Sequence, residues 1–171
     1  LEAKEPVAPT LIAETLKRLT QKNIQNSDEL AKALDKLLAN SLTTDPRRYL
    51  ELVERFRPSG KEQQLLELAF KNEAMHVRAH AAGLLLRLGA TELLEKTLAG
   101  KDVQLAKKLA TAIGRSNESL GGPILIGLAK NDKATHEIRE NAIVGAAMTR
   151  AGALELLDSV EKEEIAVSLR F

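Results

Sequence analysis

Apolar residues recur along this chain at intervals of three and four, the spacing of one face of an α-helix. In the N-terminal part, three such stretches follow Thr10, Ser27 and the Asp45-Pro46 dipeptide. Threonine and serine side chains accept hydrogen bonds from the free N–H groups at a helix start, and proline is well tolerated at the first helical position. We therefore predict three helices in this part, the last of which ends before Pro58.

A more regular pattern begins at Ser59, where short apolar-periodic stretches alternate with turns. The predicted helices cover residues 59–71, 73–88, 91–98, 102–113, 122–130, 133–148 and 153–160, followed by a helical fragment from Lys162. Gly89, Gly100 and Gly114 lie just beyond predicted helix ends, where glycine adopts the left-handed capping conformation without a steric penalty. This pattern divides the chain into N-terminal helices at 1–58 and helix pairs at 59–171.

One phrase of the sequence occurs twice. The run RLGATELLE at residues 87–95 returns 63 residues later as RAGALELLD at 150–158. The longer predicted helices also align, because VRAHAA (77–82), LAKKLA (105–110) and IRENAI (138–143) open at spacings of 28 and 33 residues. Such periods are typical of stacked helix pairs. They predict an all-α, right-handed α-α superhelix, in which the Leu-Leu of the phrase packs the short helix and its glycine forms the turn.

Composition agrees with a helical fold and excludes several functions. Leucine and alanine dominate the apolar residues, aromatic residues make up 2% of the chain, and the net charge is +1. This charge gives no indication of a nucleic-acid or membrane partner, and no apolar run is long enough to span a bilayer. Because the chain contains no cysteine, it has no disulfide, thiolate metal site, cysteine nucleophile or C-x-x-C-H haem motif.

The repeated helices resemble the HEAT-repeat family, in particular its short phycobilisome-lyase-like units. The signature runs roughly D-x-x-V-R-x-x-A-A-x-A-L-G-x-L-G. Residues 72–89 and 132–152 follow its general pattern, whereas residues 101–114 keep only the aliphatic and small positions. The resemblance implies a HEAT/armadillo-like solenoid of four to five helix pairs. It also implies that Arg78 and Arg139 bond carbonyl or carboxylate groups of the turns, near Asn72 and Asp132 respectively.

A second resemblance concerns residues 47–66, which are similar to the helical region of large exported bacterial proteins that carry a c-type cytochrome domain. It implies a periplasmic or secreted location and places haem and catalysis outside these residues. The chain lacks an initiator methionine and ends in an apolar run, so we expect it to be a piece of a larger bacterial protein.

The candidate binding site is the groove face that the longer helices of the repeat would line. Its predicted residues are His76, Ala79, His80, Gly83, Arg87, Lys107, Lys108, Thr111, Glu140 and Asn141. The expected function is a non-catalytic scaffold or protein-interaction domain, whose partner is another protein or a neighbouring domain. No cofactor is expected, and no G-x-S-x-G elbow indicates an enzyme.

The alternative function is metal or nucleic-acid binding by the same groove. His76 and His80 are four residues apart on one helix face, with Glu73 one turn earlier, and such a set can hold a divalent metal. Arg87, Lys107 and Lys108 suit phosphate groups. However, Glu140 interrupts a basic track and no aromatic residues are placed to stack bases, so we expect no nucleic-acid partner.

Overall fold

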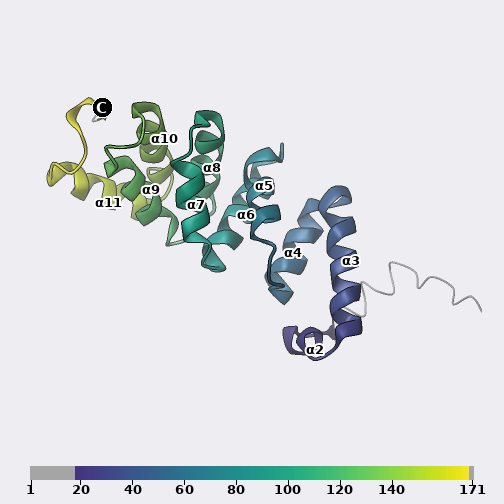
Figure 1. Cartoon of the computed structure of the whole chain (residues 1–171). Helices are drawn as coiled ribbons and strands as arrows, with labels where there is room; N and C mark the ends of the chain where they lie inside the picture. Colours follow the sequence, from purple (N-terminus) through teal and green to yellow (C-terminus); the bar gives the residue numbers. More distant parts are fainter. Residues whose placement is uncertain (1–17, 170–171) are drawn as a thin grey trace, which may run out of the picture. The chain divides into compact units, whose positions relative to one another are not determined.

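The computed structural model describes residues 18–169, which are entirely helical or irregular and contain no strand. The predicted all-α class is therefore confirmed. The described residues form ten α-helices and a short 3₁₀ helix, η1 (Figure 1). They are α2 (Gln21–Gln25), α3 (Asp28–Thr44), α4 (Pro46–Phe56), α5 (Glu62–Lys71), α6 (Met75–Arg87), α7 (Thr91–Leu98), α8 (Val103–Arg115), α9 (Gly121–Lys130), α10 (His136–Ala146), α11 (Arg150–Glu161) and η1 (Val167–Leu169).

The chain divides into two compact units, Leu1–Pro58 and Ser59–Phe171. In the first unit, α2, α3 and α4 contact one another. The predicted helix starts at Ser27 and Asp45 are confirmed, because each side chain accepts a hydrogen bond from a backbone N–H of the first turn. The predicted helix after Thr10 falls almost entirely outside the described residues.

In the second unit, alternate helices form two rows, which we call the long helices (α6, α8 and α10) and the short helices (α7, α9 and α11), although α11 has 12 residues and α10 has 11. Contacts run from α6 to α8 to α10, and in parallel from α7 to α9 to α11. Successive helices from α5 to α11 also contact each other. Neighbouring helix pairs are therefore joined through both the long and the short helices. The first helix departs from this scheme, since α5 packs mainly against α6 and also against α8.

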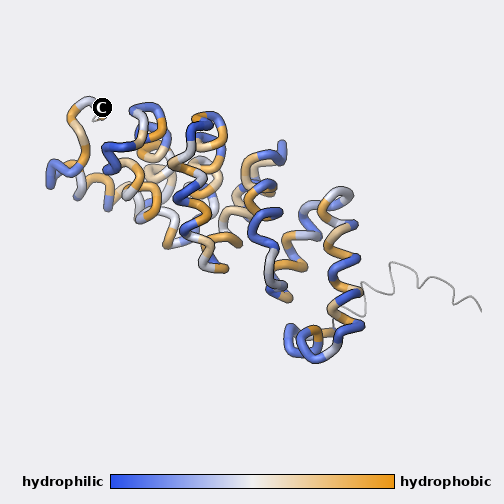
Figure 2. Tube along the Cα trace, viewed as in Figure 1, coloured by the Kyte–Doolittle hydropathy of each residue, from blue (hydrophilic) through white to orange (hydrophobic). Residues whose placement is uncertain are grey.

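Leucine and alanine fill the interior of the second unit, as the composition predicts. Leu65, Leu85, Leu94, Leu109 and Leu125 are completely buried, one from each of α5 to α9. Figure 2 shows the helices of this unit alternating between apolar and polar segments along their length. Alanine at Ala81, Ala110 and Ala142 lets neighbouring long helices approach closely, because its side chain adds little thickness to the interface.

Gly114 is a correction to the sequence-based prediction, which placed it in a turn. It lies inside α8, one residue before the helix ends. A Cβ atom built on Gly114 would collide with the carbonyl oxygen of Gly145 in α10, and one on Gly145 would lie 2.8 Å from the carbonyl oxygen of Ala110. Both glycines therefore exist for contact between two helix backbones and not for a helix end.

The repeated phrase takes two different structures. Gly89 follows α6 with a φ of +75°, the left-handed turn that was predicted. Gly152, its counterpart, lies in the first turn of α11, where Thr149 caps the helix. A Cβ atom there would collide with the carbonyl oxygen of Ala146. The predicted turn is thus wrong for the second copy, because this glycine is selected by close packing and not by backbone conformation.

The predicted helical fragment from Lys162 is also wrong. After α11 the chain turns at Glu163, whose φ is +59°, and forms no helix until η1. Ile165 and Leu169 are buried, and η1 contacts α10. The apolar residues near the C-terminus therefore cover the side of α10 by folding back, and do not extend the helix row.

We predict that this C-terminal segment is held by a pH-sensitive ion pair. Nζ of Lys130 lies 2.6 Å from Oε2 of Glu164, and this hydrogen bond lowers the pKa of Glu164 below its ordinary value. The pair is present above the ordinary glutamate pKa and is lost as the pH falls through the lowered value, because the protonated carboxyl no longer attracts the ammonium group. Carboxyl-detected NMR titration should show the lowered pKa in the wild type and an ordinary one in Lys130→Gln. An unshifted pKa in the wild type would contradict the contact.

Candidate binding surface

One face of α6 lines a hollow of about 700 Å³. His76, Ala79, His80, Gly83 and Arg87 all contribute to its wall, and their spacing places them on one stripe of the helix. These are all of the α6 residues that the sequence predicted for the groove. The opposite wall was not predicted, since it is formed by the end of α8 and the turn that follows it. The remaining lining residues are Met75, Arg115, Ser116 and Glu118.

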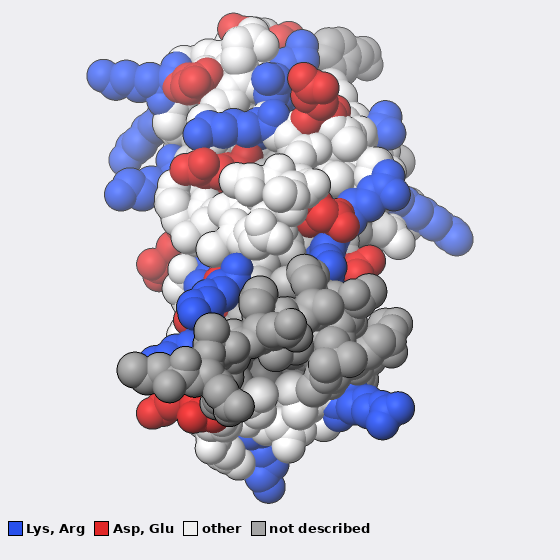
Figure 3. Space-filling model, turned by 90° about the vertical axis from the view of Figure 1, so that its right-hand side faces the viewer, with Lys and Arg blue, Asp and Glu red and all other residues white. Residues whose placement is uncertain are grey.

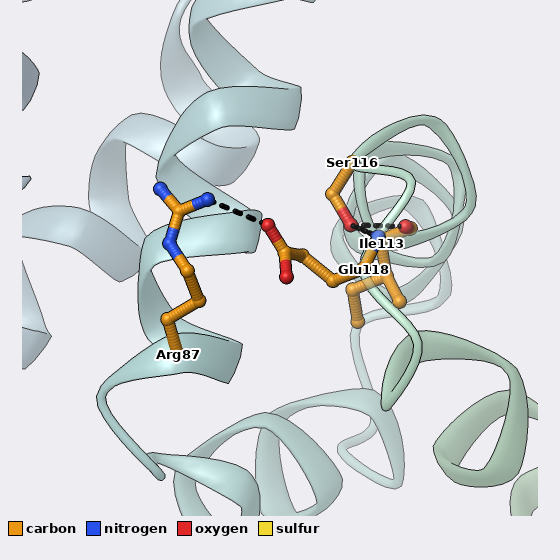
Figure 4. Close-up of polar contacts among 4 residues, drawn as sticks. All are labelled: Arg87, Ile113, Ser116 and Glu118. Carbon is orange, nitrogen blue, oxygen red and sulfur yellow. Dashed lines mark hydrogen bonds and ion pairs between the residues drawn. The ribbon is translucent and has the colours of Figure 1, made fainter.

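Across the hollow, an ion pair joins α6 to the turn after α8. Nη1 of Arg87 lies 2.6 Å from Oε1 of Glu118, and Figure 4 shows the two side chains reaching toward each other from separate elements. Ser116 shapes this turn because its hydroxyl donates to the carbonyl of Ile113 at 2.7 Å and accepts from the N–H of Glu118. Glu118 is therefore held in place to neutralise Arg87.

Gly83 lies where the turn after α8 comes close to α6. A Cβ atom on this residue would lie 3.4 Å from carbon atoms of both Ser116 and Glu118, a tight contact. Ala79, one turn earlier, is itself small. The small residues at these two positions therefore let the turn after α8 lie close to α6 beside the hollow.

The stripe on α6 continues on α8 and α10. Gly114 and Ala110 of α8 face Gly145 of α10, so the residues one position later on α8 and one position earlier on α10 lie on the same side of this contact. We call this exposed side of α6, α8 and α10 the long-helix face. On α8 it comprises Lys107, Lys108, Thr111 and Arg115. On α10 it comprises Glu137, Glu140, Asn141 and Val144, and Met148 just beyond the end of α10 continues it.

The predicted groove residues of α8 and α10 therefore share a face with those of α6, but they do not line the hollow. Lys107 and Lys108 are exposed, and Thr111, Glu140 and Asn141 are half-buried. Val144 and Met148 were not predicted for the groove, although the repeat aligns them with Gly83 and Arg87 and could have indicated them. Glu118 carried no such signal, since it lies in a turn that varies between the pairs.

The basic charge of the long-helix face is concentrated on α8. Arg87 is neutralised by Glu118, and Glu140 lies 3.2 Å from Nε2 of His136. Within the described part of the chain, no ion pair involves Lys107, Lys108 or Arg115. Elsewhere basic and acidic side chains are interspersed, as Figure 3 shows for the side of the molecule that it draws.

Arg78 and Arg139 bond the turns or helix ends that come before their helices. Arg78 donates through Nη1 to the backbone carbonyls of Asn72 and Glu73, at 2.6 and 2.8 Å. Arg139 donates through Nε to the carbonyl of Ala129 at 2.8 Å, and its Nη1 lies 3.1 Å from Oδ1 of Asp132. The predicted structural role of both arginines is confirmed, because each ties a long helix to the turn before it.

For metal binding, no group of three or more His, Asp or Glu side chains within residues 18–169 is arranged to hold an ion. His76 and His80 both line the hollow, but Glu73 does not join them there. None of the helices in the described range has the length and apolar character needed to cross a membrane.

Comparison with known proteins adds no family to these observations. No family model, curated protein or solved structure matches the chain.

Proposed function

We propose that the second unit is a right-handed, HEAT-like α-α solenoid that serves as a non-catalytic scaffold or protein-interaction domain. Two observations support this architecture. The long and short helices form separate, continuous rows of contacts, and Arg78 and Arg139 make equivalent bonds within two of the helix pairs, each to the turn or helix end that comes before its own helix. In a solenoid each repeat contacts mainly its neighbours, which leaves an extended face available for binding. The helices before Pro58 would then form a degenerate repeat or a cap.

The hollow beside α6 is the observation that carries the binding proposal. It lies where the long-helix face meets the turn after α8, and its rim combines cationic, acidic and small side chains. A passive spacer has no need for a hollow that Gly83 lines and that an ion pair frames. A linear segment of a protein partner fits such a site, because its side chains enter the recess while its backbone follows the face.

The proposal is tested by selecting peptides from a random displayed library on the full chain. We expect enriched peptides whose binding is lost in the double variant Lys108→Glu with Arg115→Glu, which reverses the charge of the long-helix face. The matched control is Lys32→Glu with Lys36→Glu, which changes the net charge equally on the exposed surface of α3. Its binding should equal that of the wild type.

Two results would contradict binding by this face. If no peptide is enriched over an unrelated helical protein, the unit is a passive spacer. If both double variants lose binding equally, the attraction is a non-specific effect of net charge. Circular dichroism of each variant establishes that it is folded before its binding is compared, since all four substitutions are at exposed positions.

A further inference from the structure

We infer that the long-helix face binds an acidic linear peptide, whose carboxylate enters the hollow at Arg115 and whose apolar side chain, three residues away, packs on Val144 and Met148. This inference rests on the proposed binding function and specifies its partner. It depends on three features of the face: its uncompensated cations, its apolar end and the distance between them.

The cations favour an acidic ligand. Arg115 lines the hollow, and Lys108 lies two turns earlier on the same stripe of α8. Neither has an ion pair with another described residue, whereas Glu118, the acidic residue of the hollow, is held by Arg87. A carboxylate entering the recess therefore meets an arginine that can form two parallel hydrogen bonds with it. Glu118, which could otherwise occupy Arg115, is already paired with Arg87.

Acidic residues at the other end of α10 place limits on the position of the ligand. Glu137 and Glu140 lie on the long-helix face in the first half of α10, and Glu140 is paired with His136. They repel a second carboxylate near the start of α10. The favourable part of the face is therefore its C-terminal half, where the end of α8 with Arg115 contacts the end of α10, which carries Val144 and is followed by Met148.

Two apolar side chains at the C-terminal end of the face are exposed to water. Val144 is 51% and Met148 39% exposed, at positions that glycine, threonine or arginine occupy in the other two long helices. Val144 and Met148 are four residues apart and offer an apolar surface, on which a leucine-sized side chain loses most of its contact with water. The unbranched methionine adapts to the shape of such a side chain.

The separation of these two features fixes a spacing in the peptide. Packed helix axes are about 8–10 Å apart, and the contact of Gly114 with Gly145 places α8 and α10 toward the close end of that range. A peptide in the polyproline II conformation advances about 3.1 Å per residue and returns to the same side every third residue. Residues i and i+3 of such a peptide therefore reach adjacent helices, one with an acidic side chain and the other with an apolar one.

The inference is tested with labelled nine-residue peptides in a proline- and serine-rich background, measured by fluorescence anisotropy on the full chain. The matching peptide has glutamate at its third position and leucine at its sixth. A shifted peptide has the leucine at its fifth position, and an inverted peptide has lysine in place of glutamate. We expect the matching peptide to bind at least about tenfold more tightly than either of the others.

Variants of the protein test each contact separately. Arg115→Gln should weaken the matching peptide about tenfold and leave the inverted peptide unchanged. Val144→Gln with Met148→Gln should weaken it by a similar factor, because a leucine side chain then packs on amide groups. The matched controls are Lys133→Gln and Leu157→Gln, which remove a charge and an apolar side chain at exposed positions that do not belong to the long-helix face. Both should bind like the wild type.

The outcomes separate this inference from the proposed function. Equal binding of matching and shifted peptides would overturn the inferred spacing. Selection of basic or neutral peptides that still depend on Lys108 and Arg115 would overturn the acidic partner and leave the binding function standing. Tighter binding of a single-stranded oligonucleotide by the same residues would replace the peptide with nucleic acid. If no probe binds and no library peptide is enriched, both proposals fail.

Discussion

Replacing Gly114 with alanine is expected to destabilise the chain by about 3 kcal/mol, a large effect for one added methyl group. The new Cβ atom would collide with the carbonyl oxygen of Gly145, so the obstacle is the backbone of α10 and not a flexible side chain. Relief requires α8 and α10 to move apart, and this loosens the contacts of both helices. Thermal unfolding followed by circular dichroism should show a melting temperature lowered by about 6–12 °C.

Gly127 provides the matched control for this prediction. It lies inside α9, is exposed, and has no atom within 4 Å of a Cβ built on it. Alanine at this position should therefore stabilise the chain by about 0.5–1 kcal/mol, because alanine favours the helix more than glycine does. If Gly114→Ala raised the melting temperature as Gly127→Ala does, the close crossing of α8 and α10 would be wrong.

Replacing Arg139 with methionine is expected to cost about 2–3 kcal/mol. Its side chain is only 11% exposed; its hydrogen bond connects α10 to α9, and its ion pair with Asp132 connects α10 to the turn between them. Methionine preserves most of the volume but leaves the carbonyl of Ala129 without its donor in a buried setting. The melting temperature and the urea midpoint should both fall, and hydrogen exchange should increase first in the last turn of α9.

Asp132→Asn is the control that distinguishes the ion pair of Arg139 from its hydrogen bond to the carbonyl of Ala129. The Asp132 side chain is 90% exposed, and an exposed ion pair contributes little, so this change should alter stability by less than about 0.5 kcal/mol. A loss as large as that of Arg139→Met would show that the ion pair, and not the bond to the carbonyl, holds the turn. Arg78→Met, at the equivalent position of α6, should resemble Arg139→Met because Arg78 also donates to two turn carbonyls.

The long-helix face shows how the packing of this unit bears on its proposed use. Close contact through Gly114 and Gly145 brings Arg115 and Val144 onto neighbouring helices at a short separation. The binding spacing that we propose therefore depends on the same glycines that determine stability. A variant such as Gly114→Ala should alter peptide preference as well as the melting temperature, even though Gly114 itself is buried.

Local signals made most of the elements predictable. The caps at Ser27, Asp45 and Asp102 mark helix starts because a side-chain oxygen must satisfy the first N–H groups, and all three accept such a bond in the structure. The α6 part of the candidate site was predictable for the same kind of reason. Residues at helical spacing on one amphipathic stripe share a side of the helix whatever surrounds it, as His76 and Arg87 do.

The sequence by itself determined the helical class, most helix starts and the stripe on α6, because these follow from short-range periodicity and capping. It also predicted the roles of Arg78 and Arg139, because the two arginines recur at the same position of the repeated helices. Only the tertiary structure decided that Gly114 and Gly152 are packing positions and that the C-terminal segment folds back on α10. It alone paired Arg87 with Glu118, which is 31 residues away along the chain. Such contacts depend on how closely separate helices approach, and no local pattern records that distance.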